Sequence, residues 1–144
     1  SEEVPSLMKA VFVTEFGGPE KLRCESIPDP KPLAGQAFVP IHASGVNFID
    51  IYFRTGLYKA DPPVILGMEA AGVVEAVGEG VTEVAPGDRV AYAMARGSYA
   101  ELAVVPAWQL VKIPEGLETD VAAASMLPSA VTATPHSVAA CSRV

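Results

Sequence analysis

The sequence predicts a mainly β domain, a barrel-like sheet that carries one or two short helices. About eight short strand-like segments recur along the chain, each alternating or apolar in pattern. Twelve glycines and 13 prolines divide these segments, and the clearest helical stretch has its own start and stop signals. With 144 residues, 50% of them hydrophobic, the chain is long enough to bury one core. We therefore expect one β-rich globular domain.

The first third of the chain is predicted to form a hairpin and then a long strand. Residues 8–13 and 22–26 are the hairpin partners, and a proline-rich loop without ladder bonds follows. Residues 36–44 alternate apolar and polar side chains, which is typical of a half-buried strand. Pro40 lacks the N–H that a central strand donates, so the strand should lie at an edge or carry a bulge there. His42 should face solvent rather than bind a metal.

Residues 47–55 are predicted to form a short helix. Asn47 is a favourable N-cap residue and Gly56 is a favourable residue just past the C-terminus, so both ends have a physical reason. Asp50 and Arg54 are four positions apart, a spacing at which opposite charges pair on a helix surface. We interpret them as such a pair.

A glycine-rich stretch organises the middle of the chain. Residues 70–77 are predicted to form an apolar strand, and Gly78-Glu79-Gly80 interrupts it. This break begins like the GxGxxG fingerprint of dinucleotide sites, but Glu83 occupies the place of the third glycine. The Pro86-Gly87 pair also argues against a helix starting there. We therefore predict a hairpin turn rather than a phosphate-binding loop.

The remaining elements follow from the same patterns. Thr119 is predicted to cap the last of them, a helix. The expected segments are strands at 89–94, 98–104 and 110–114, a helical turn at 106–109, and a final helix at 120–127.

Composition excludes some classes of function. The net charge of −7 and a pI near 4.7 argue against nucleic-acid binding, which needs clustered Lys and Arg. No apolar run has transmembrane length, and the N-terminus has no signal-peptide layout. Cys24 and Cys141 lie far apart with no Cys or His at ligand spacing, which predicts neither a disulfide framework nor a zinc knuckle. A cytoplasmic protein without membrane association is expected.

Four motifs, in order and with matching gaps, resemble those of one family. They are MKAVFVTEFGGPEKL at 8–22, ASGVNFIDIYFRTGLY at 43–58, GDRV at 87–90 and GSYAE at 97–101. The chain resembles the N-terminal domain of the zinc-independent, zeta-crystallin-like quinone oxidoreductases of the medium-chain dehydrogenase/reductase superfamily. The resemblance implies a GroES-like, partly open β-barrel over residues 1–125. We expect residues 126–144 to be an atypical or truncated tail, and the family's Rossmann domain to be absent.

The resemblance also implies that no zinc is bound. The zinc-dependent alcohol dehydrogenases of the same superfamily have a cysteine ligand where this chain has Asn47. They have a histidine ligand where it has Met68, just before Glu69. Amide and thioether groups are weak Zn²⁺ ligands, so no tight site follows. Their four-cysteine lobe would fall between Tyr92 and Ser98, where this chain has no cysteine.

Asn47 and Tyr52 are the candidate catalytic residues that the resemblance suggests. Both would also bind the cofactor, together with Met68 and Thr132, the latter matching the threonine of a G-L-T-A motif whose glycine is missing here. Purely structural roles remain open: Asn47 serves as a helix cap, and Tyr52 packs on Phe48.

Three further residues have weaker claims on the same cleft. Tyr58 and Met68 are candidate wall residues on the substrate side. Glu69 is more often structural than a general acid, although its place beside Met68 keeps it among the candidates.

The implied activity is hydride transfer from NADPH to a small-molecule quinone without a metal, which depends on positioning and on polar groups that stabilise developing charge. One alternative is reduction of enoyl or acrylyl substrates, which are activated alkenes, by a member of the same superfamily. Another is a non-catalytic, stand-alone barrel module. Because no complete dinucleotide site is encoded, we expect the isolated chain to be inactive. Its uncovered apolar face favours self-association into a homo-oligomer.

Overall fold

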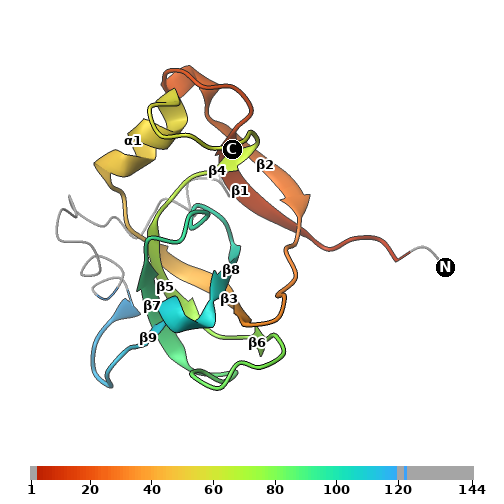
Figure 1. The fold of residues 1–144 in the computed structure, drawn as a ribbon, viewed down its shortest axis with the longest axis vertical. Helices are drawn as coiled ribbons and strands as arrows, with labels where there is room; N and C mark the ends of the chain where they lie inside the picture. The colour runs from red at the N-terminus through yellow and green to blue at the C-terminus, as the bar shows by residue number, and fades with distance from the viewer. Residues whose placement is uncertain (1–2, 120–121, 123–144) are drawn as a thin grey trace.

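The computed structural model describes residues 3–119 and residue 122. These residues form a mainly β fold with a curled, half-barrel sheet and one α-helix (Figure 1). This confirms the predicted fold class. The strands are β1 (Leu7–Val13), β2 (Arg23–Pro28), β3 (Gln36–Ser44), β4 (Val64–Ile65), β5 (Glu69–Val73), β6 (Ala76–Val77), β7 (Arg89–Ala93), β8 (Leu102–Pro106) and β9 (Val111–Lys112). The helices are α1 (Phe48–Thr55) and the 3₁₀ turns η1 (Pro19–Lys21) and η2 (Ala107–Gln109).

The strands form two sheets that share a boundary. The three-stranded sheet has the order β2-β1-β4, and the predicted hairpin of β1 and β2 is antiparallel. The six-stranded sheet runs β6-β3-β5-β7-β9, with β8 also paired to β3. A bridge between Ala10 and Ala100 connects the sheets, and the Val11 N–H donates to the Tyr99 carbonyl at 2.8 Å. The chain before β8 is thereby held against β1.

Strand β3 is the centre of the six-stranded sheet, not an edge. It pairs with β6 and β8 along its first half and with β5 along its second. The register shifts between Ile41 and Ala43, immediately after Pro40, so of the two predicted alternatives the bulge is confirmed. The shift turns Ser44 inward, where it is 2% exposed, while His42 faces solvent as predicted.

The strand expected at 110–114 is limited to β9, and two other predicted strands differ more. The strand expected at 70–77 is divided into β5 and β6, because these segments pair with opposite ends of β3. The strand expected at 98–104 begins later, as β8, since the chain before it bonds to β1 instead; the Glu101 N–H donates to the Lys9 carbonyl at 3.0 Å. Residues 78–88, all of which are described, contain no helix start, in agreement with the predicted turn.

The main core lies inside the curled sheet. Gly72 on β5 passes so close to β3 that an added Cβ would lie 2.0 Å from the Pro40 carbonyl oxygen. A glycine is required there because backbone, not a mobile side chain, occupies the space. The buried residues of this core are Ala37, Val39, Ala70, Val74, Val84, Val90, Tyr92, Ala103, Val105, Ala107 and Leu110.

Three further expectations concern the chain outside the sheets. Cys24, on β2, is disulfide-bonded, so the expectation that the cysteines form no disulfide framework is wrong. The helix expected at 120–127 lies outside the described residues, apart from Ala122. In the described part of the chain, no helix has the length and apolar character needed to cross a membrane.

Candidate functional site

Helix α1 organises the candidate site because it starts directly after β3. Asn47 has extended backbone (φ −135°, ψ 156°) and precedes the helix, and Gly56 ends it with φ +83°, so both predicted ends are confirmed. The Asn47 backbone carbonyl accepts the Asp50 N–H at 3.1 Å. The Asp50 carboxylate in turn accepts the Asn47 N–H at 3.0 Å, which closes the first turn. The Asn47 amide is thus available for another partner.

That partner is Glu69 on β5. Asn47 Nδ2 donates to Glu69 Oε1 at 2.9 Å, and both residues are buried, with 5% and 0% exposure. The Glu69 backbone carbonyl also accepts the Gly45 N–H at 3.0 Å and the Ser44 hydroxyl at 3.1 Å. A Cβ on Gly45 would lie 2.0 Å from Glu69 Oε1, so the turn between β3 and α1 fits closely around the Glu69 side chain.

Asn47 has one polar atom left over. Its Oδ1 is buried and has no hydrogen-bond partner among the residues that the structure describes. Buried polar groups are nearly always hydrogen-bonded, and an unpaired one is therefore informative. The neighbours on either side, Val46 and Phe48, are exposed by 40% and 60%, so Asn47 lies just beneath the surface.

A second, partly buried contact ties the helix to the segment before β8. The Tyr99 hydroxyl donates to Asp50 Oδ2 at 2.7 Å. Burial raises the pKa of the Asp50 carboxyl, and the hydrogen bonds from the Asn47 N–H and the Tyr99 hydroxyl partly oppose this. The pKa of Tyr99 is raised by burial and then by the nearby Asp50 and Glu69 carboxylates. Both groups are therefore biased towards their neutral forms.

The predicted surface pair of Asp50 and Arg54 is wrong. Asp50 is only 6% exposed and points inward to Tyr99. Arg54 instead donates from Nε to the Gly17 carbonyl at 3.2 Å, which ties the end of α1 to the loop after β1. The Asp50 carboxylate accepts from the Asn47 N–H and the Tyr99 hydroxyl instead.

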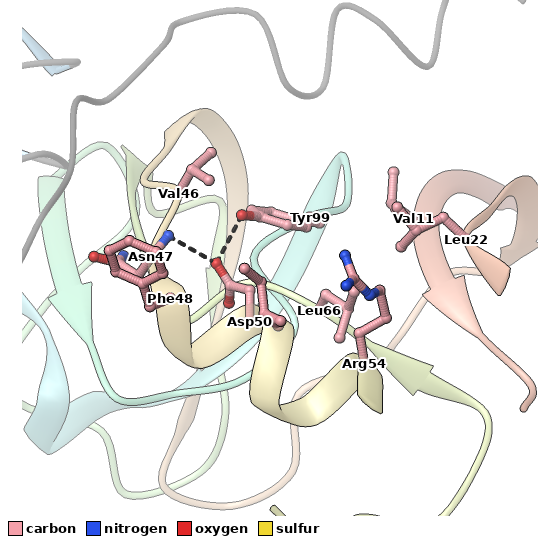
Figure 2. A pocket seen from close by; sticks show the side chains of 10 residues that line it. Val11, Leu22, Val46, Asn47, Phe48, Asp50, Arg54, Leu66 and Tyr99 are labelled. Carbon is pink, nitrogen blue, oxygen red and sulfur yellow. Dashed lines mark hydrogen bonds between the residues drawn. The ribbon is translucent and has the colours of Figure 1, made fainter. Parts of the chain in front are cut away.

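A cavity of about 310 Å³ lies between α1 and the loop after β1, and Figure 2 shows its side chains. Most of the lining is apolar, and the polar groups are those of the network just described together with Arg54. A volume of this order suits a small ring or a short apolar chain. The lining residues are Val11, Leu22, Val46, Asn47, Phe48, Asp50, Ile51, Arg54, Leu66 and Tyr99.

The other predicted site residues lie elsewhere. Tyr52 is 37% exposed on α1, and its ring packs on Tyr58 with centroids 5.4 Å apart. Tyr58 itself is 46% exposed. Met68 is buried, and neither it nor these tyrosines line the cavity. Thr132 lies outside the described residues. The structure thus gathers Asn47, Asp50, Glu69 and Tyr99 at one place, and Tyr52 with Tyr58 at another.

Sequence reasoning missed Tyr99 and the buried role of Asp50. Both belong to motifs that the sequence does display, GSYAE at 97–101 and the helix motif at 43–58. Their meeting could not be predicted from those motifs because 49 positions separate the two residues.

No metal centre is evident in the described part of the chain. Residues 3–119 and 122 contain no group of three or more His, Cys, Asp or Glu side chains that could hold a metal ion. Asn47 and Met68 occupy the positions at which the zinc-dependent alcohol dehydrogenases have a cysteine and a histidine ligand. Asn47 donates its amide N–H to a carboxylate there, and Met68 is buried.

The fold and the helix-centred site define a known class of domain. Residues 33–115 match the alcohol dehydrogenase GroES-like domain. The chain belongs to this family, and with it to the medium-chain dehydrogenase/reductase superfamily.

The more specific likeness is to quinone oxidoreductases. The Pseudomonas aeruginosa quinone oxidoreductase is 43% identical over 128 residues, which are 88% of this chain and 39% of that protein. The solved structure of the Pseudomonas syringae quinone oxidoreductase has a TM-score of 0.80 at 43% identity, covering 83% of this chain and 37% of the other. The Escherichia coli quinone oxidoreductase complexed with NADPH has a TM-score of 0.80 at 38% identity, with the same two coverages.

These relatives are longer than the chain. The chain spans about two fifths of the length of the curated relatives it matches, and the match is to their N-terminal part. By name, these relatives are oxidoreductases.

Proposed function

We propose that this chain is the N-terminal catalytic domain of an NADPH-dependent, zinc-independent quinone oxidoreductase. The observation that carries the proposal is the buried, hydrogen-bonded Asn47 beside an apolar cavity, on a fold whose relatives are named quinone oxidoreductases. Asn47 and Tyr52 are the residues to which we assign contact with cofactor and substrate, with Met68 and Thr132 as further cofactor contacts.

The residues present fit one end of a nicotinamide dinucleotide. The unpaired Asn47 Oδ1 accepts a hydrogen bond, and Tyr52 offers an exposed ring and hydroxyl on the same helix. The segment 78–88, whose glycines begin like the phosphate-binding fingerprint, contains no helix N-terminus that would bind phosphates. When bound, NADPH supplies a hydride. This chain would hold the nicotinamide end and a second domain the phosphates.

This chain would supply one wall of the site, which is apolar and already in place before a ligand binds. Asn47 is held by Glu69 and Asp50 before any ligand arrives, so no reorganisation is needed at the moment of reaction. The apolar lining of the cavity excludes water from an apolar quinone ring and strengthens the polar contacts that remain. Quinone or activated-alkene substrates fit such a lining equally well, and we favour quinones because the relatives carry that name.

A chimaera tests the proposal directly. Residues 1–125 of this chain would replace the corresponding part of the Pseudomonas aeruginosa relative, and NADPH oxidation would be followed with a panel of quinones and enones. Quinone-dependent turnover that falls about tenfold or more in Tyr52→Phe and Asn47→Ala is expected, since each removes a contact worth about 1.4 kcal/mol or more. No turnover in a folded chimaera that still binds NADPH would refute the assignment. Turnover with enones alone would favour the alkene reductase.

The isolated chain provides the complementary test. We propose that it is inactive alone and cytoplasmic, and that its exposed apolar side chains on α1 favour a homo-oligomer. On this helix Phe48 is 60% and Ile51 39% exposed. Light scattering that shows a strict monomer at high concentration would count against the oligomer. Quinone reduction by the chain alone would overturn its proposed inactivity.

A further inference from the structure

We propose that Glu69 is a positioning residue that fixes the Asn47 amide in one orientation, with Oδ1 presented as a hydrogen-bond acceptor to an N–H or O–H donor at the nicotinamide end of the cofactor. This inference deepens the proposed function and rests on it for the identity of the ligand. The contact between Asn47 and Glu69 is itself independent of that function.

The orientation follows from the chemistry of the two groups. An asparagine amide can be placed in two ways that exchange its oxygen and nitrogen. Glu69 Oε1 accepts from Nδ2, and exchanging the two amide atoms would place Oδ1 against this acceptor. With Nδ2 held at 2.9 Å from Glu69 Oε1, Oδ1 must face away from Glu69. The bound molecule therefore meets an acceptor and must bring a donor.

The surroundings are built to keep this arrangement. Glu69 is fully buried, and its backbone carbonyl is bonded to the turn that carries Asn47. Gly45 leaves the space that the Glu69 carboxylate occupies, since a Cβ there would lie 2.0 Å from Oε1. The Asn47 N–H is held separately by Asp50. The backbone N–H and the side-chain NH₂ of Asn47 are thus held by different partners, whereas its Oδ1, like Asp50 Oδ1, is buried without a partner among the described residues.

The acceptor is close enough to the surface to be used. Asn47 is 5% exposed, but the flanking Val46 and Phe48 are 40% and 60% exposed, and both line the cavity with Asn47 (Figure 2). Two groups at the nicotinamide end carry suitable donors, the carboxamide NH₂ and the ribose hydroxyls.

The positioning role of Glu69 can be measured without any ligand. Asn47 is the only asparagine in the sequence, so its side-chain NH₂ pair is unambiguous in a ¹H–¹⁵N spectrum once the two glutamines are assigned. We expect slow hydrogen exchange of this pair in the wild type and in Glu69→Gln, whose amide oxygen can still accept. Exchange should be at least tenfold faster in Glu69→Ala. Ser44→Ala is the matched control, because it removes a bond to the Glu69 backbone and leaves the Glu69 side chain in place.

The acceptor role of Asn47 Oδ1 is tested with NADPH and its 3-acetylpyridine analogue, which lacks the carboxamide N–H donors. Titrations follow the fluorescence of the reduced ring with the chain and with the chimaera described above. Glu69→Ala should weaken NADPH binding about tenfold or more, and Glu69→Gln should stay within about threefold of the wild type. If the carboxamide is the donor, the analogue binds the wild type more weakly and Glu69→Ala weakens it no further. If a ribose hydroxyl is the donor, Glu69→Ala weakens the binding of both ligands to the same extent.

The outcomes separate the two proposals. Unchanged exchange of the Asn47 NH₂ pair in Glu69→Ala overturns the positioning role, whatever binds. Faster exchange together with unchanged NADPH affinity overturns the acceptor role. If neither the wild-type chain nor the chimaera binds NADPH, the proposed function and the acceptor role both fail, and the exchange data alone decide whether Glu69 positions Asn47.

Discussion

Gly45→Ala is the substitution that most directly tests the packing of the site. Gly45 lies in the turn between β3 and α1, and its missing side chain leaves room for Glu69. An alanine Cβ would lie 2.0 Å from Glu69 Oε1 and 2.4 Å from its Cγ, distances at which one of the two groups must move. Because Glu69 is fully buried and bonded to the same turn, it cannot move without losing its hydrogen bond to Asn47.

The expected loss of unfolding free energy combines two costs and one smaller gain. Forcing one extra methyl into a packed interior costs about 1–3 kcal/mol. Losing a buried hydrogen bond to a charged group costs about 1.5–3 kcal/mol. The reduced entropy of the unfolded chain returns about 0.4–1 kcal/mol. The net loss of unfolding free energy should be about 2–5 kcal/mol, a large share of the about 5–15 kcal/mol typical of a domain.

Equilibrium urea unfolding of the chain measures this loss. Gly17→Ala is the matched control, because its Cβ would meet Lys21 Cγ at 2.9 Å on an exposed, flexible side chain that can move away. The control should change the unfolding free energy by less than about 1 kcal/mol. The Asn47 NH₂ pair should also lose its protection in Gly45→Ala. A loss below about 1 kcal/mol with that protection intact would refute the reasoning.

Three further substitutions test the buried polar groups. Tyr99→Phe removes the donor to Asp50 and should cost about 1.5–3 kcal/mol in urea unfolding, and a smaller cost would show that the carboxylate has found another donor. Asp50→Asn tests the raised pKa of Asp50, whose ordinary value is 3.8. Since the folded-state pKa lies above the unfolded one, this group's stabilising contribution is complete below the unfolded pKa and is lost as the pH rises through the folded pKa. Wild type should therefore lose stability relative to Asp50→Asn as the pH increases from about 4, and a constant difference from about pH 3 to about 8 would contradict the shift. Tyr92→Phe removes a buried hydroxyl that has no partner among the described residues, so it should be neutral or stabilise by up to about 1 kcal/mol, whereas a clear destabilisation would reveal a hidden partner.

The sequence alone determined the features that depend on neighbouring residues. The alternation in β3, the two ends of α1 and the turn that replaces a phosphate-binding loop were all predictable, because strand pattern, capping and turn formation act over a few positions. The motifs at 43–58 and 97–101 also identified the family and the candidate residues Asn47 and Tyr52.

Only the tertiary structure decided which of these residues meet. The bulge after Pro40 turned Ser44 inward against its alternation, and Asp50 left its expected surface partner for Tyr99. Asn47 bonds to Glu69 across 22 positions, and Tyr99 bonds to Asp50 across 49. Such contacts depend on strand register and on which buried group lacks a partner. Both are set by segments far apart in the sequence, so a local pattern does not predict them.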